Sequence, residues 1–143
     1  PNDLDSFRKT GQRRDLNRQK FEANKLIELL KNFDSPASKN ISYLTHIVKV
    51  RSRIKAFHPE ASMKCISNNI DNCLIIQRGL DEESVYVICN FSNRFLNIAP
   101  LIELNLSQSF SNKKFLDHIT GSLINTDIIK LKPYQVMWIS LTE

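Results

Sequence analysis

Apolar side chains recur at helical spacing in the N-terminal part of the chain, after a polar start. Residues 1–19 show neither helical nor alternating apolar periodicity, so we predict a loop with at most one helical turn there. Apolar residues follow a helical repeat over 21–32, and a second helical stripe begins at Pro36 and ends at Pro59. Ser35 is a suitable N-cap for the second stripe. Two helices are therefore expected ahead of Pro59.

Beyond Pro59 the pattern changes to that of β-strands. Segments 73–78 and 84–91 are rich in β-branched and aromatic residues, and the polar stretch 79–83 between them has the composition of a hairpin connection. Further short strands are expected near 95–106, 114–119, 127–132 and 134–141, with a turn at 120–122. The predicted fold class is mainly β with two N-terminal helices, and the strands form an antiparallel β-sandwich.

Length and composition limit the class of protein. A chain of 143 residues with 41% hydrophobic residues suits one compact domain, or a small domain with a helical lead-in. No run of about 18 apolar residues is present, so we expect no transmembrane helix and no membrane partner. The start of the chain has neither an initiator Met nor the pattern of a signal peptide, and it reads as a piece of a longer polypeptide.

The charge is unevenly distributed along the chain. Residues 1–60 carry 13 Lys and Arg against 7 Asp and Glu, whereas residues 61–143 carry 7 against 8. The basic part could bind nucleic acid or an anionic substrate, but the solvated faces of two amphipathic helices account for it better. We therefore do not expect a nucleic-acid partner. The shift in composition at His58 and Pro59 marks the predicted domain boundary, with domains at 1–59 and 60–143.

The cysteines and histidines predict neither a disulfide framework nor a metal site. The three cysteines are odd in number and lack C-x-x-C spacing, and the three histidines are far apart: Cys65, Cys73, Cys89, His46, His58 and His118. Such usage is typical of a reducing compartment, so we expect a cytoplasmic protein without metal or cofactor.

One segment does not fit the requirements of helix or strand packing. Between Thr10 and Arg18 nearly all residues are polar and four are charged, with Leu16 as the one apolar member apart from a glycine. Such a stretch is poor at burying surface and good at holding polar groups at a site. Two further signatures follow, Ala56–Pro59 at the end of the second helical stripe and Pro133–Trp138 near the C-terminus.

In that order the three signatures resemble the C-terminal part of the α-amylase family, glycoside hydrolase family 13. The likeness is closest to the branch of sucrose phosphorylase and glucosylglycerate phosphorylase-like enzymes, and it covers nearly all 143 residues. A (β/α)8 barrel needs about 200 to 250 residues, so the chain cannot contain one. The resemblance implies that 1–59 is the remnant of the catalytic barrel, its final loop and helices, and that 60–143 is the C-terminal antiparallel β domain.

The resemblance also implies a role for the charged segment. It corresponds to the loop after the eighth barrel strand, where the first arginine of the family motif, here Arg14, hydrogen-bonds hydroxyls of the transferred glucose. A guanidinium offers five fixed donors, which suits adjacent hydroxyls. The alternative is that Arg14 pairs with Asp15 or binds a carbonyl. Asp15, Asn17 and Arg18 are expected to support the loop rather than to contact the sugar.

The activity implied by the resemblance is transfer or cleavage of α-glucosyl groups with a retaining mechanism. Such chemistry needs two carboxyl groups about 5 to 5.5 Å apart, and the resemblance places them in the missing barrel. The expected partners are therefore that barrel and an α-glucoside, and the fragment alone should be inactive. The acidic stretch 81–83 is interpreted as a solvated turn rather than a catalytic pair. Phosphorylase and hydrolase activities remain open alternatives.

A stand-alone binding module is the alternative function, for carbohydrate or for nucleic acid. Tyr134 and Trp138 lie four residues apart in a predicted strand and would share one face, where they could stack on a sugar. Core packing uses aromatic residues in the same way, and it is the favoured explanation. Phe57 is likewise expected to pack where the helices meet the β domain.

Overall fold

The computed structural model describes residues 3–16, 21–104, 106–107, 113–125 and 127–142. The chain divides into two compact units, 1–46 and 47–143. The predicted domain boundary after residue 59 concerns the longer polypeptide and stays a prediction. None of the helices among the described residues combines the length and the apolar character needed to cross a membrane.

Two short helices occupy the segment that was predicted to be a loop, and that prediction is wrong. They are α1, Leu4–Thr10, and α2, Arg13–Leu16. The Asp3 side chain caps α1 by accepting a hydrogen bond from the Ser6 amide at 2.9 Å. At the other end Gly11 adopts a left-handed conformation with φ of 66°, and its N–H reaches the Phe7 carbonyl. Capping residues, not apolar periodicity, specify α1.

The two helices predicted from apolar periodicity are present. They are α3, Ala23–Lys31, and α4, Pro36–Arg53. Ser35 caps α4 as predicted, because its hydroxyl accepts a hydrogen bond from the Ser38 amide at 3.1 Å. The helix ends at Arg53 rather than at Pro59. Ile54 is extended there and a 3₁₀ turn, Lys55–Phe57, follows, so a change in backbone conformation ends α4 before the proline is reached.

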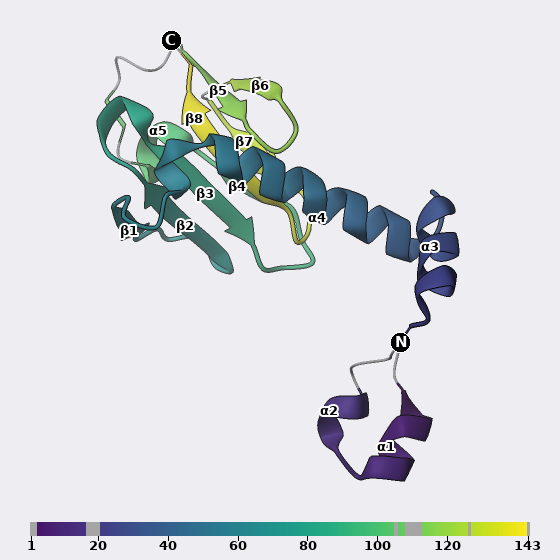
Figure 1. The fold of residues 1–143 in the computed structure, drawn as a ribbon. Helices are drawn as coiled ribbons and strands as arrows, with labels where there is room; N and C mark the ends of the chain where they lie inside the picture. Colours follow the sequence, from purple (N-terminus) through teal and green to yellow (C-terminus); the bar gives the residue numbers. More distant parts are fainter. Residues whose placement is uncertain (1–2, 17–20, 105, 108–112, 126, 143) are drawn as a thin grey trace. The chain divides into compact units, whose positions relative to one another are not determined.

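All the strand pairs are antiparallel, and the second unit is mainly β (Figure 1). The strands are β1 Met63–Ile66, β2 Cys73–Arg78, β3 Val85–Asn90, β4 Leu96–Ile98, β5 Lys114–Asp117, β6 Ser122–Asn125, β7 Ile129–Leu131 and β8 Val136–Leu141. Six of them form one sheet in the order β1-β2-β3-β8-β5-β6, and β4 pairs with β7. The strands β1 and β6 were not predicted from the sequence. The strand predicted near 95–106 is also wrong in its second half, where the short helix α5, Pro100–Glu103, begins at a proline.

Alternation along the central strand β3 separates two apolar clusters. Tyr86 and Ile88 belong to the main core, whereas Val85 and Val87 belong to a second cluster. The main core joins both sheets through these buried residues: Ile66, Ile75, Tyr86, Ile88, Ile98, Leu104, Phe115, Ile129, Leu131, Met137 and Ile139. Because the core joins residues of the large sheet to residues of the small sheet, the fold is consistent with the predicted β-sandwich.

The second cluster forms where the 3₁₀ turn meets the sheet. Phe57 is buried and its ring centroid lies 4.7 Å from that of Trp138, so the predicted packing role of Phe57 is confirmed. Trp138 thus packs in this cluster and not in the main core. The Arg78 guanidinium fixes the turn by donating to the carbonyl oxygens of Ala56 at 3.1 Å and His58 at 2.8 Å.

Candidate functional site

Residues 3–16 form a hairpin of two short helices, named here the α1–α2 hairpin. The Asp3 amide donates to the Leu16 carbonyl oxygen at 2.9 Å and joins the two ends. Near the turn, the Thr10 hydroxyl donates to Asp15 Oδ2 at 2.5 Å, and the Gln12 amide donates to the Thr10 hydroxyl oxygen at 3.2 Å. The charged segment that the sequence analysis selected therefore has a defined backbone in its first half.

The hairpin exposes Arg14. In the described part of the chain, neither a hydrogen bond nor an ion pair engages its guanidinium, and the neighbouring Asp15 is bonded to Thr10 instead. The alternative of an Arg14–Asp15 pair is thus not what the structure shows. Asn17 and Arg18 lie outside the described residues, so their supporting role stays a prediction, as does the contact of Arg14 with a sugar.

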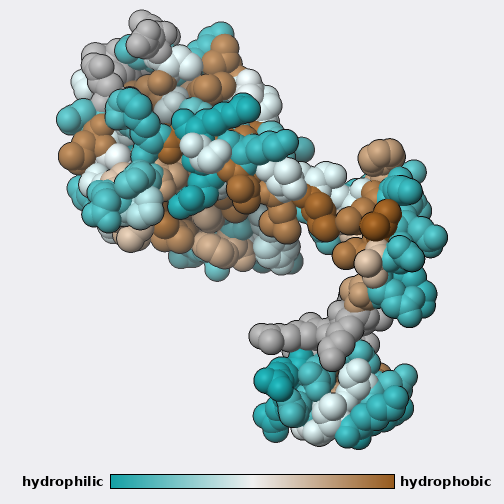
Figure 2. All heavy atoms as spheres, in the orientation of Figure 1, coloured by the Kyte–Doolittle hydropathy of each residue, from teal (hydrophilic) through white to brown (hydrophobic). Residues whose placement is uncertain are grey.

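The carboxylates of the hairpin already have local partners. Asp3 caps α1, Asp5 lies 3.7 Å from the Arg8 guanidinium, and Asp15 accepts from Thr10. Figure 2 shows that the hairpin surface is largely hydrophilic. The exposed donors of the hairpin are suited to binding a polar ligand.

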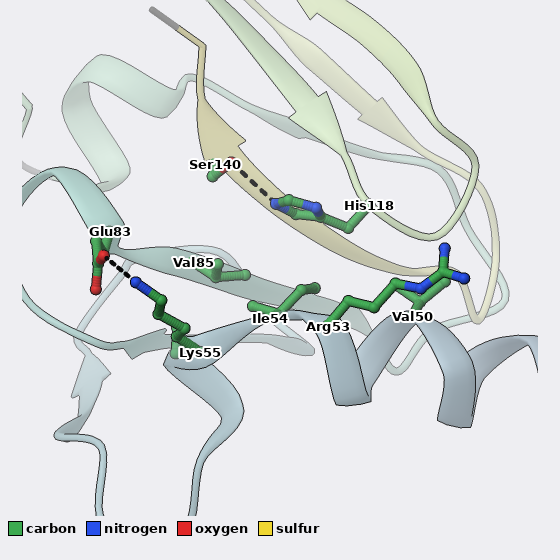
Figure 3. A pocket seen from close by; sticks show the side chains of 9 residues that line it. Val50, Arg53, Ile54, Lys55, Glu83, Val85, His118 and Ser140 are labelled. Carbon is green, nitrogen blue, oxygen red and sulfur yellow. Dashed lines mark hydrogen bonds and ion pairs between the residues drawn. The ribbon is translucent and has the colours of Figure 1, made fainter.

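A hollow of about 410 Å³ lies in the second unit, beside the second apolar cluster (Figure 3). Its polar lining includes two pairs, His118 Nε2 with Ser140 Oγ at 2.9 Å and Lys55 Nζ with Glu83 Oε1 at 3.3 Å. The full lining is Val50, Arg53, Ile54, Lys55, Ala56, Glu83, Val85, His118 and Ser140. No pattern in the sequence indicates this site, since β5 and β8 become adjacent only in the folded sheet.

The His118–Ser140 pair resembles a base and nucleophile, but no hydrogen bond from a third side chain to His118 is found among the described residues. Burial lowers the pKa of His118, and the Asp117 carboxylate opposes that shift. Asp117 itself accepts hydrogen bonds from the Thr120 hydroxyl at 2.7 Å and from the amides of Ile119 and Trp138. Because that carboxylate supports the β5–β6 turn, it does not orient the imidazole for catalysis.

The thiols are poor candidates for chemistry. Burial, with smaller contributions from Cys89 and Glu103, raises the pKa of Cys73 to about 11, and burial also raises the pKa of Cys89. Both thiols therefore stay protonated at neutral pH. All three cysteines are free. Across the described residues, no group of three or more His, Cys, Asp or Glu side chains is arranged to hold a metal ion.

The proposed aromatic pair does not share a strand, and the sequence-based placement of Tyr134 is wrong. Tyr134 lies in the turn before β8 with φ of 56°, so strand alternation does not relate it to Trp138. Its side chain is 69% exposed, while Trp138 packs on Phe57. The preference for a packing role is thus confirmed for Trp138.

The acidic stretch 81–83 was interpreted as a solvated turn. Asp81 and Glu83 are exposed in a 3₁₀ turn, as predicted.

Comparison with known proteins gives one informative relative. No family model matches the chain. The chain is 32% identical over 139 residues to the glucosylglycerate phosphorylase of Allomeiothermus silvanus. That match covers 97% of this chain but 22% of the relative, so the chain spans about a fifth of the length of the protein it matches. Almost the whole chain is therefore similar to one small part of a phosphorylase.

Proposed function

We propose that the chain is the C-terminal fragment of a carbohydrate-active enzyme that transfers or cleaves α-glucosyl groups. The parent enzyme is sucrose phosphorylase-like, of the α-amylase family, and acts by a retaining mechanism through two carboxyl groups carried by its barrel. The observation that carries the proposal is the similarity to a glucosylglycerate phosphorylase along 97% of this chain and 22% of that protein. The fragment itself is catalytically inactive.

The surface of the first unit supports the proposal of a missing barrel. Among its described residues no apolar side chain is buried, and the buried positions are Ser35 and Ser38. Apolar side chains lie instead on the surface of α3, of the following turn and of the first part of α4 (Figure 2): Ile27, Leu29, Phe33, Ile41 and Leu44. An exposed apolar surface of this kind marks an interaction site. The proposed partner is the catalytic barrel of the same polypeptide.

Arg14 is the proposed contact with the substrate. Its guanidinium is exposed and has no partner among the described residues, so its donors are available for two hydroxyls of the transferred glucose. Asp15 supports the loop through Thr10, and the same supporting role is proposed for Asn17 and Arg18. The substrate class is an α-glucoside.

A hybrid enzyme tests the proposal. The segment of the Allomeiothermus silvanus enzyme that matches this chain is replaced by the 143 residues, and phosphate-dependent cleavage of glucosylglycerate is measured. The hybrid should be active and the isolated chain inactive. Arg14→Ala should lower kcat/KM roughly 10- to 150-fold, because a hydrogen bond to a charged group contributes about 1.5 to 3 kcal/mol.

Matched variants make the assignment specific. Arg14→Lys should recover part of the activity, since an ammonium group lacks the planar fork of donors. Arg13→Ala removes the adjacent exposed arginine and should leave kcat/KM close to that of the hybrid. Loss of activity in Arg13→Ala but not in Arg14→Ala would show that the family motif has been matched to the wrong arginine. Glucosyl transfer by the isolated chain would overturn the whole proposal.

A further inference from the structure

One hydroxyl group bridges the α1–α2 hairpin near its turn, in addition to the Asp3–Leu16 backbone bond at its ends. Thr10 is the last residue of α1, and its Oγ1 lies 2.5 Å from Asp15 Oδ2 in α2. The same oxygen accepts the Gln12 amide at 3.2 Å. The single hydroxyl proton has two acceptors within reach, Asp15 Oδ2 and, at the longer distance of 3.0 Å, the Ser6 carbonyl oxygen in α1. Thr10 therefore links α1 to the residue between the helices and to the second helix.

The second helix needs such a bond more than an ordinary helix does. α2 has four residues, and a helix of one turn is unstable by itself because nucleation fixes several residues for very few hydrogen bonds. The short O–H···O⁻ distance to Asp15 is that of a charge-assisted hydrogen bond, the stronger kind. It fixes the position of α2 and hence the Cα of Arg14, next to Asp15.

The same bond also determines the partner of the Asp15 carboxylate. A carboxylate one residue from Arg14 is a nearby counter-ion for a flexible guanidinium. In the structure one of its oxygens is occupied by Thr10. Arg14 has no partner among the described residues, so its donors stay free for a ligand.

We infer that Thr10 is a positioning residue for Arg14, acting through Asp15 to fix α2 and to keep the guanidinium available. This inference rests on the proposed function, because it assigns Arg14 the sugar contact. Thr10 itself touches no substrate.

The hybrid enzyme separates this role from general stability. Thr10→Val keeps the shape of the side chain and removes the hydroxyl, and it should lower kcat/KM roughly tenfold. Thr10→Ser keeps the hydroxyl and should retain most of the activity. In an Arg14→Ala background, Thr10→Val should have almost no further effect, because a residue that acts through Arg14 has nothing left to position. Equal losses in both backgrounds would overturn the inference.

A second measurement uses the 143-residue chain and needs no activity. In solution NMR, Thr10→Val should shift the backbone amide signals from Gln12 to Leu16, including Arg14, whereas Thr10→Ser should leave them close to wild type. Unchanged Arg14 signals in Thr10→Val would also overturn the inference. If Arg14→Ala leaves the hybrid fully active, the proposed sugar contact fails. If Arg14→Ala is impaired and Thr10→Val is not, the inference alone fails.

Discussion

The two units of the chain use their apolar residues differently. In 1–46 the helix α3 has a strongly amphipathic pattern, yet none of its described side chains is buried. In 47–143 the strand β3 also alternates, and its residues enter two apolar clusters. Ile88 is fully buried, whereas Ile27 in α3 is 50% exposed. Isoleucines on equally regular apolar patterns are thus buried in one unit and exposed in the other.

The comparison shows what an amphipathic pattern does and does not specify. Periodicity determines which face of an element is apolar, but burial of that face requires a second element with a matching surface. The second unit supplies both sheets of its own sandwich. Among the described residues of the first unit the helices bury no apolar side chain, so their apolar faces are without such a matching surface there.

The largest expected difference is in the free energy of unfolding when one of two phenylalanines is replaced. Phe115 is completely buried in the main core, and Phe33 is 83% exposed. Phe115→Ala should lower the free energy of unfolding by about 3 to 5 kcal/mol, because it leaves a cavity in a packed core. Phe33→Ala, the same substitution in the first unit, should change it by less than about 0.5 kcal/mol. Urea unfolding of both variants measures the difference, and similar losses would contradict the distinction between the units.

A smaller effect is expected where a buried amide links two loops of the second unit. Asn90 Nδ2 donates to the carbonyl oxygens of Arg94 at 2.7 Å and Lys132 at 2.8 Å. Asn90→Ala should lower the free energy of unfolding by about 1 to 3 kcal/mol, since it removes both hydrogen-bond donors from partly buried acceptors. Asn90→Asp should cost more, because it places a carboxylate oxygen beside two carbonyl oxygens. Thermal unfolding compares the two, and an Asp variant as stable as wild type would refute the explanation.

Much of the second unit could be predicted from the sequence, and the reason is local. Apolar runs rich in β-branched residues identified β2 and β3 in this unit, and apolar periodicity likewise identified α3 and α4, which begin in the first unit; all four patterns extend over six or more residues. The strands β1 and β6 form the two edges of the large sheet and are mostly exposed, so they lack the apolar pattern that marked the equally short β4, β5 and β7. The helix α1 was missed because caps define it, although Asp3 and Gly11 are recognisable signals in the sequence, and the four residues of α2 are too few to show a helical period.

The candidate site was only partly accessible to sequence analysis. The motif selected Arg14 and Asp15, which the structure places next to one another in α2. The contribution of Thr10 depends on a bond between two helices that were expected to be a loop. Tyr134 was misplaced because a positive φ interrupts the strand, and alternation assumes that the backbone stays extended.

The pH dependence of stability offers a finer test within the second unit. Burial lowers the pKa of His118 below its ordinary value of about 6.5, so protonation favours the unfolded chain. The stabilising effect of the neutral imidazole is complete above about pH 6.5 and is lost as the pH falls from there toward the lowered folded value. His118→Asn should flatten the fall in the free energy of unfolding between pH 7.5 and 5.5. If the free energy of unfolding falls with pH equally steeply in variant and wild type, His118 does not contribute to that fall.

The smallest expected effect follows from removing the whole first unit. Both apolar clusters consist of residues from 54 to 141, so a chain of residues 47–143 keeps every member of its cores. Its free energy of unfolding should lie within about 0.5 kcal/mol of that of the full chain, as for changes away from a core. By contrast, a peptide of residues 1–46 should show no cooperative transition, since its helices bury no apolar side chain among the described residues.

The matched control for that deletion is a chain that begins at Ile54. It loses Arg51, whose guanidinium donates to the Phe57 carbonyl oxygen at 3.2 Å, and it should be less stable than 47–143 by about 1 to 3 kcal/mol. Denaturant unfolding of the three chains gives the comparison. If deletion of 1–46 lowers the free energy of unfolding as much as deletion of 1–53, the first unit contributes to the stability of the second. Its exposed apolar surface would then no longer support the proposal of a missing barrel.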